Sequence, residues 1–452
     1  MNFIWVRIMR FNLKQFIVFA LMVFVAPVPH IRAEEAVFTG LSSLIDEALA
    51  QNPQIEAARK KWEAARFRVT QASALPDPTA GYSYMGNMVE TRTGPQENMY
   101  EFEQEIPFPG KLIHKRKMAR ADVDLAEAQL KAAEREVKAK LTQAYYDLYA
   151  LQKTLELTEQ IHILLVASED KTRADYAGMR GSLAEHVNVQ NMVSQLLERL
   201  LILRQQKETL MAYIKTLVNR DIDLSWEGFD RPAVPVIGVT LEGLLLKLEE
   251  NNTQVLEAMA MAKREKHAHS LAKYENAPDF SIGFRYVEVG AGTTSHPDDG
   301  QDAWMIPIKV TLPIWQNRIG ATIKEAKSNL KASESQLQDA ENQVEFELKN
   351  AYFQFQSQQQ IAELYQLTYI PQARIVFESE QAGYESGQVG LTALIDSKRR
   401  YFEAQISYYQ ALAGALKTFS EIERLIGEDI QPMNNGPKMV KETNSEVNNE
   451  SQ

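Results

Sequence analysis

The sequence predicts a mainly α-helical protein that carries a small number of membrane β-strands, built from an internally duplicated chain. Three observations predict this fold class. Short motifs recur about two hundred residues apart, several short segments alternate apolar and polar residues, and two much longer segments repeat apolar residues every three or four positions. A chain of 452 residues is too long for one small core and suits one large or duplicated unit.

The first 33 residues are expected to be a secretory signal peptide and not part of the fold. A short apolar run, FIVFALMVFVA, follows three basic residues, Arg7, Arg10 and Lys14. The tripeptide IRA, which ends at Ala33, is an acceptable cleavage site. The apolar run is too short to span a bilayer, although an uncleaved anchor is the alternative interpretation.

Composition and motifs exclude several classes of function. Acidic side chains outnumber basic ones by 60 to 49, which argues against a nucleic-acid partner. The absence of cysteine excludes disulfide bonds and thiolate metal sites. There is no nucleophile elbow, phosphate loop or HExxH motif, so we expect neither an enzyme nor a cofactor. His267 and His269 are two residues apart and would not face each other on a helix, so we expect no metal site there.

Short motifs recur in both halves of the chain in the same order. NPQI at 52–55 is matched by NTQV at 252–255, and AYYDL from Ala144 is matched by AYFQF from Ala351. The spacing between matched motifs grows slowly along the chain, as expected after a tandem duplication with small insertions. We therefore expect a signal peptide at 1–33, a first repeat at 34–219 (helix, two barrel strands, long helical hairpin), a linker at 220–240, a second repeat at 241–427 and a disordered tail at 428–452.

Four segments alternate apolar and polar residues. Before Pro107, the apolar residues Tyr100, Phe102 and Ile106 alternate with glutamates, and three more segments behave alike, at 79–84, 280–286 and 304–312. This alternation favours strands with one dry face, as in a half-buried soluble sheet or in the outer membrane. The aromatic residues, the charged opposite face and the polar loops are typical of outer-membrane strands. Four strands cannot close a barrel, so several identical chains would have to combine.

Two long segments carry a heptad pattern of apolar residues. The first extends from Ala119 to Leu155, and the second repeats it 207 residues later, from Ala326 to Phe355. The first helix could extend from Leu112 to Tyr176 without an internal proline, which corresponds to about 97 Å. A rod of this length does not fit in a compact domain. The alternative interpretation is an intramolecular or dimeric coiled coil.

The transitions between strand and rod are marked by prolines. Pro107 and Pro313 cannot donate a hydrogen bond to a sheet, so each is expected to end a strand. Pro109 and Gly110 are expected to form a bend before the first rod begins. A basic cluster follows the first joint, and we expect it mainly to keep the helix start solvated, although contact with anionic lipid is the alternative. The cluster comprises Lys111, Lys115, Arg116, Lys117 and Arg120.

Each rod ends in a turn far from the strands. The two turns read YAGMRGSLAEHV from Tyr176 and YESGQVGLTALI from Tyr384. Gly181 and Gly390 are expected to give the backbone freedom to reverse direction. Ser182 and Thr392 are candidate N-caps of the returning helices.

With this pattern the chain resembles the TolC-type outer-membrane efflux proteins over residues 40–427. The resemblance is carried by the duplicated order of elements, by QEIPFPGKL and VTLPIWQNRIG at the joints, and by YESGQVGLTALID from Tyr384 to Asp396. The sequence PFPGK, followed by a basic helix start, is most similar to the branch that serves heavy-metal and related cation pumps. The resemblance implies a homotrimer, in which a 12-stranded β-barrel is continuous with a 12-helix α-barrel.

The resemblance also implies a function and its partners. The protein would be the outer-membrane exit duct of a tripartite efflux pump, extending into the periplasm. It would passively conduct substrates, possible metal cations among them, from a periplasmic adaptor (membrane fusion) protein and an inner-membrane pump to the exterior. It would contact outer-membrane lipid. The alternatives are a soluble periplasmic coiled-coil adaptor, and the same fold serving type I protein secretion.

Two candidate sites follow from the resemblance. The first is the pair of adaptor-docking tips, which are otherwise ordinary hairpin turns; they comprise Gly181, Ser182, Leu183, Gly390, Leu391 and Thr392. The second is the periplasmic aperture, at Asp396, where three copies would form a carboxylate ring that favours cations. Ala393 stands one turn earlier and Asn188 is the matching first-repeat residue, so a ring with two tiers is not expected. A solvated or helix-capping acid is the alternative for Asp396.

Overall fold

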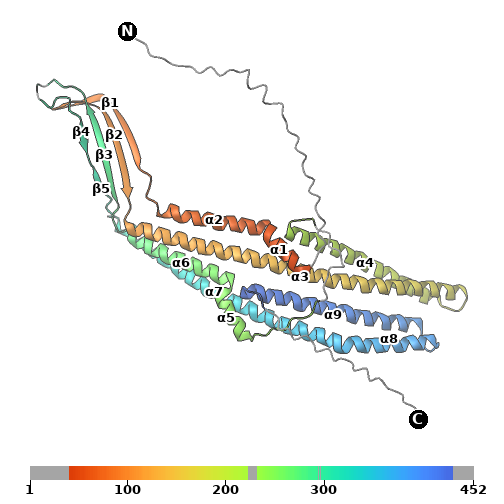
Figure 1. Cartoon of the computed structure of the whole chain (residues 1–452). Helices are drawn as coiled ribbons and strands as arrows, with labels where there is room; N and C mark the ends of the chain where they lie inside the picture. The colour runs from red at the N-terminus through yellow and green to blue at the C-terminus, as the bar shows by residue number, and fades with distance from the viewer. Residues whose placement is uncertain (1–39, 222–231, 294, 296, 431–452) are drawn as a thin grey trace, which may run out of the picture.

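A computed structural model of the chain describes residues 40–221 and 232–430, apart from residues 294 and 296. The predicted signal peptide, half of the predicted linker and nearly all of the predicted tail lie outside the described residues. The molecule is elongated, with a small sheet at one end and the tips of two helical hairpins at the other (Figure 1). The predicted class, mainly helical with an antiparallel sheet, is confirmed.

The order of elements in the first half of the chain recurs in the second. The first half contains α1 (Gly40–Gln51), α2 (Pro53–Ser73), β1 (Thr79–Thr91), β2 (Gly94–Ile106), α3 (Pro109–Ala177) and α4 (Leu183–Val218). The second half contains α5 (Leu241–Asn251), α6 (Thr253–Tyr274), β3 (Phe280–Val289), β4 (Ala303–Met305), β5 (Ile308–Val310), α7 (Gln316–Leu364), a π-helical turn (Tyr365–Tyr369), α8 (Ile370–Glu385) and α9 (Leu391–Ile426).

The strands form one antiparallel sheet in the order β1, β2, β3 and then β4 with β5. Both β4 and β5 pair with β3, one after the other, so they form a single strand position that is interrupted at Pro307. Proline cannot donate to a ladder, which explains the interruption. Within the described residues the sheet therefore has four strand positions and two free edges, at β1 and at β4 with β5, as the sequence predicts.

The two faces of the sheet differ in the way that the alternation predicts. On one face, apolar side chains lie opposite one another on adjacent strands and are exposed; they include Tyr82, Tyr100, Phe102, Ile282, Phe284, Trp304, Ile308 and Val310. On the other face, ion pairs join the strands. Glu101 of β2 accepts from Arg285 of the neighbouring β3 at 2.7 Å, and Glu103 of β2 accepts from Lys309 of β5, across β3, at 2.6 Å.

The first rod is a single helix, α3, of 69 residues. At 1.5 Å per residue it is about 104 Å long, which confirms the predicted rod. The second rod is divided into α7 and α8 by the π-helical turn. Pro371 explains this division. Proline lacks an N–H, and its ring clashes with the carbonyl of the residue four positions earlier. The wider π-helical turn accommodates the missing hydrogen bond and the ring. None of the helices in the described ranges is both long and apolar enough to cross a membrane.

Each half of the chain buries its own apolar core. The heptad residues Val137 and Leu141 of α3 are fully buried against α1 and α4, and Val344 and Leu348 of α7 are fully buried against α5 and α9. The predicted heptad stripes therefore face the protein interior. Ile430 also enters the second core, so the start of the predicted tail is packed and not free.

Two buried asparagines explain why NPQI and NTQV recur. The side chain of Asn52 caps α2 by accepting from the N–H of Gln54, and it donates to the carbonyl of Leu217 at 2.8 Å. Asn252 caps α6 in the same way and donates to the carbonyl of Leu425 at 2.8 Å. Each asparagine thus fixes the entry of a short helix to the end of a returning hairpin helix.

The strand-to-helix joints differ in part from the prediction. β2 ends at Ile106, directly before Pro107, and Pro313 lies between β5 and α7. However, α3 already begins at Pro109, so Pro109 and Gly110 form its first turn and not a bend before it. Proline suits this position because its missing N–H would have no helical partner. Gly110 is required by packing, since a Cβ there would lie 2.6 Å from the ring of Tyr274.

Candidate functional site

The two tips reverse direction at residues other than those predicted. Met179 and Gly387 adopt the left-handed conformation, with φ of 57° and 76°, whereas Gly181 and Gly390 do not. At each tip the next N–H bonds back five residues, from Arg180 to the carbonyl of Asp175 at 2.8 Å and likewise after Gly387. These are Schellman motifs, which end a helix with one left-handed residue. In the second tip the left-handed residue is a glycine, which the sequence could have indicated. In the first tip it is a methionine, which gives no such indication.

The returning helices are capped differently. Ser182 accepts a hydrogen bond from the N–H of Glu185 at 3.2 Å, so the predicted N-cap is confirmed. In the second tip the N-cap is Gly390, which has no side chain to accept a bond. Thr392 is the second residue of α9, so the prediction that it is an N-cap is wrong.

The two tips also present different surfaces. Met179 is 96% exposed and Leu183 is 53% exposed, so the first tip carries two apolar side chains in solvent. Leu391, which corresponds to Leu183, packs instead against the cluster around Ile395 and Phe402. A methionine with a positive φ and a fully exposed side chain is unusual in a turn that contacts no other protein.

Asp396 lies one turn into α9 and pairs with Arg399 at 3.3 Å. The same arginine also pairs with Glu403 at 2.9 Å. In the single chain, the negative charge of Asp396 is therefore partly neutralised by Arg399 of the same helix. Its side chain remains about one-third exposed.

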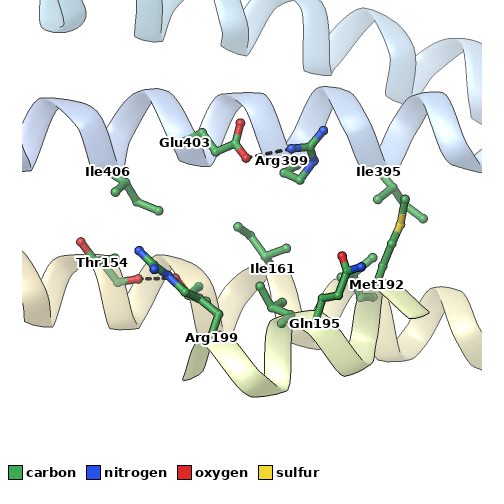
Figure 2. A pocket seen from close by; sticks show the side chains of 12 residues that line it. Thr154, Ile161, Met192, Gln195, Arg199, Ile395, Arg399, Glu403 and Ile406 are labelled. Carbon is green, nitrogen blue, oxygen red and sulfur yellow. Dashed lines mark hydrogen bonds and ion pairs between the residues drawn. The ribbon is translucent and has the colours of Figure 1, made fainter. Parts of the chain in front are cut away.

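A cleft of about 550 Å³ lies between α9 and the hairpin of α3 and α4, along their contact (Figure 2). Its walls are apolar, with Ile161 of α3 facing Ile395 and Ile406 of α9. Charged side chains lie at its rim, Arg199 on α4 and the Arg399–Glu403 pair on α9. The cleft thus runs along the contact between the two halves of the chain, close to Asp396.

An aromatic cage next to Asp396 was not predicted. The ammonium group of Lys398 lies 4.0 Å from the ring centre of Phe377 on α8 and 4.9 Å from that of Phe402. Burial among these rings lowers the pKa of Lys398. Sequence alone could not find this cage, because Phe377 lies on the opposite helix of the hairpin.

At the other end of α3, Lys111 is buried and does not act as a solvating charge as expected. Its side chain is 9% exposed and its ammonium lies 2.6 Å from the carboxylate of Asp279, just before β3. The same carboxylate accepts from the N–H of Phe108 at 2.8 Å. Burial raises the pKa of Asp279, but these two hydrogen bonds and the nearby positive charge outweigh it and lower the pKa below its usual value.

The histidines meet in an arrangement that the spacing could not show. The rings of His114 on α3 and His267 on α6 lie 5.7 Å apart, whereas His269 is not part of this pair. Burial lowers the pKa of both paired histidines, and Lys117 lowers it further. Within the described ranges, no three His, Asp or Glu side chains gather in a way that could hold a metal ion.

Comparison with known proteins identifies the family. The chain matches the outer membrane efflux protein family over residues 44–214 and 244–428, which fall on the two halves described above. It is similar to the cobalt-zinc-cadmium resistance protein CzcC of Cupriavidus metallidurans, with 21% identity over 392 residues, 86% of this chain and 90% of the relative.

Solved structures share the fold. The outer membrane protein VceC of Vibrio cholerae has a TM-score of 0.71 and 17% identity, covering 86% of this chain and 97% of that one. A membrane protein from Pseudomonas aeruginosa has a TM-score of 0.73 and 18% identity, covering 85% of this chain and 93% of that one. The chain belongs to the outer membrane efflux protein family.

Proposed function

We propose that the protein is the outer-membrane exit channel of a tripartite efflux pump and acts as a homotrimer. The observation that carries this proposal is a sheet with an exposed apolar face and two unpaired edges, joined to a helical rod of about 104 Å. An unpaired edge exposes backbone groups that need partners, and lipid offers none. Three copies with four strand positions each would form the 12-stranded barrel that the TolC-type resemblance implies.

The apolar face of the sheet is proposed to contact outer-membrane lipid. Tyr82, Phe284 and Trp304 lie on this face and are exposed, as expected for a lipid-facing surface with aromatic side chains near its borders. The ion-paired face, with Glu101 and Arg285, would then line a water-filled lumen. The rods would extend from the barrel into the periplasm as a 12-helix tunnel.

The hairpin tips are proposed to dock a periplasmic adaptor. Met179 and Leu183 are exposed apolar side chains at a hydrogen-bonded Schellman turn, which suits insertion into a groove on a partner. The second tip, where Leu391 is packed inward, would contribute mainly backbone and polar contacts. Passive conduction follows from this role, because transport energy would come from the inner-membrane pump.

Divalent metal cations are the proposed cargo. The curated relative is named for resistance to cobalt, zinc and cadmium. The excess of acidic over basic side chains and the position of Asp396 beside the cleft also favour passage of cations.

A deletion strain complemented with the gene tests this function. Loss of the gene should sensitise the cells to cobalt, zinc or cadmium, and the wild-type gene should restore resistance. The protein should fractionate with the outer membrane and migrate as a trimer in an unheated gel and as a monomer after heating. Recovery of the processed protein as a detergent-free periplasmic monomer would refute the proposal.

A further inference from the structure

The internal duplication indicates how two copies of the chain meet. Inside one chain, the two halves meet where β2 pairs with β3, where α3 packs along α6, and where α3 contacts α9; the first two of these contacts have counterparts at the outer edges (Figure 1). The corresponding elements are β5 with β1 and α7 with α2. Among the described strands, β1 and β5 lie at opposite edges of the sheet and do not pair. If copies associate, as the proposed function requires, these edges can repeat the contact that already exists inside the chain.

The correspondence between the halves can be set residue by residue. The N-caps of the two rods are Phe108 and Trp315, so a position in α3 corresponds to one 207 residues later in α7. The caps of the short helices are Asn52 and Asn252, so positions in α2 and α6 differ by 200. The Pro-Asp dipeptides that precede β1 and β3 lie 202 positions apart in the sequence, so Asp77 corresponds to Asp279.

The buried ion pair at the joint has a counterpart at the outer edges. Lys111 corresponds to Arg318, and its partner Asp279 corresponds to Asp77, so a cation and a carboxylate are retained at both positions. Arg318 and Asp77 are both exposed in the single chain, and neither forms an ion pair with any other described residue. Guanidinium can replace ammonium here because it also binds carboxylates, with two parallel hydrogen bonds.

Exposed aromatic side chains lie beside these two charges. Phe108 stacks on Tyr274 inside the chain at 5.7 Å, whereas its counterpart Trp315 is 70% exposed. His267 packs on His114 inside the chain, whereas its counterpart Phe67 is 71% exposed. These large apolar side chains therefore stand where the internal contact predicts a partner.

The helices provide a second charge pair. Inside the chain, Lys263 of α6 pairs with Asp124 of α3 at 2.7 Å. Their counterparts are Glu63 of α2 and Lys331 of α7, in which both charges are reversed. Because both charges change sign together, the two side chains still carry opposite charges and attract each other. The neighbouring internal pair, Arg264 with Asp122, has uncharged counterparts and is not repeated.

We propose that copies of this chain join by repeating the internal contact, with Arg318 of one copy paired to Asp77 of the next. Trp315 and Phe67 pack beside this pair, and Lys331 faces Glu63 of the next copy. The partner is a second copy of the same chain, because the outer edges carry the counterparts of this chain's own internal contact, with opposite charges retained at two of its ion pairs.

Charge reversal tests the ion pair. Arg318→Asp or Asp77→Arg should each markedly lower the temperature at which the trimer dissociates in detergent, because each places like charges together. The double variant, Arg318→Asp with Asp77→Arg, should restore most of the loss. Arg116→Asp, at an exposed cation near the start of α3, is the matched control and should leave the temperature unchanged. Additive losses in the double variant would overturn the proposal.

Crosslinking gives an independent test, because the chain contains no cysteine. Asp77→Cys combined with Arg318→Cys, treated with a short bismaleimide, should give covalent dimers and trimers on a denaturing gel. Each single cysteine variant should give none. Lys111→Cys with Asp279→Cys should crosslink within one chain. A native-sized trimer that neither crosslinks nor shows rescue would overturn this interface but not the channel, whereas a monomeric wild-type protein would overturn both.

Discussion

Replacing Asp279 with alanine should destabilise the joint between sheet and rods. The substitution removes the carboxylate that accepts from both Lys111 and the N–H of Phe108, and it leaves the Lys111 ammonium, whose side chain is 9% exposed, without a partner. Two charges 2.6 Å apart attract by about 6 kcal/mol at an effective dielectric constant of about 20, most of which offsets their desolvation. An unpaired buried charge typically costs about 3–5 kcal/mol. Because Asp279 is 21% exposed and the lysine can reach water, we expect about 3 kcal/mol.

A double-mutant cycle separates this coupling from simple loss of packing. Asp279→Ala, Lys111→Met and the double variant would be compared by thermal unfolding of the detergent-purified protein, followed by tryptophan fluorescence. The double variant should be more stable than Asp279→Ala alone, because no unpaired charge remains. If the two losses simply add, the ion pair does not stabilise the joint and the reasoning is wrong.

The same pair predicts a pH dependence. The pKa of Asp279 is lower in the folded protein than its ordinary value of 3.8, so the folded state favours the ionised form. Its contribution to stability is complete above that ordinary pKa and is lost as the pH falls through the lower folded value. The wild type should therefore lose stability in this acidic range more steeply than Asp279→Ala does. Equal slopes in melting temperature against pH would contradict the assignment.

Four further predictions follow from individual contacts. Asn252→Ala should destabilise the second half by about 2–3 kcal/mol in thermal unfolding, since it removes a cap and a buried hydrogen bond to Leu425, whereas Asn252→Ser, whose hydroxyl can still accept the capping bond, should lose less. Leu183→Glu should abolish adaptor co-purification while the trimer stays intact; undiminished binding would exclude the first tip as a docking surface. Asp396→Asn should lower cation selectivity in single-channel recordings, and unchanged selectivity would exclude the proposed carboxylate ring at the aperture. Met179→Gly should stabilise the first tip by about 1 kcal/mol and slow its proteolysis, because glycine adopts a positive φ without strain.

The sequence predicts those features that depend on local periodicity. The alternation before Pro107 and the heptads around Val137 and Val344 depend only on which face of a strand or helix is apolar, so strand faces, rods and core residues follow from the residues themselves. Pro371 could also have indicated the interruption of the second rod, because proline disturbs any helix interior.

Features that depend on distant partners could not be predicted in this way. From the sequence, Gly110 is expected to form a bend, but in the structure it makes room for the ring of Tyr274, which lies on another helix. Lys111 looks like a solvated charge until the fold brings Asp279 to it. At the first tip the left-handed residue is Met179 and not the nearby Gly181, because the Schellman hydrogen bonds fix the position of the reversal regardless of which residue stands there.

The mass of the detergent-extracted protein, measured by native mass spectrometry after signal removal, tests the central claim most directly. We expect a single species of three chains that separates only on heating. A species of one chain, stable in buffer without detergent, would contradict the proposed trimer.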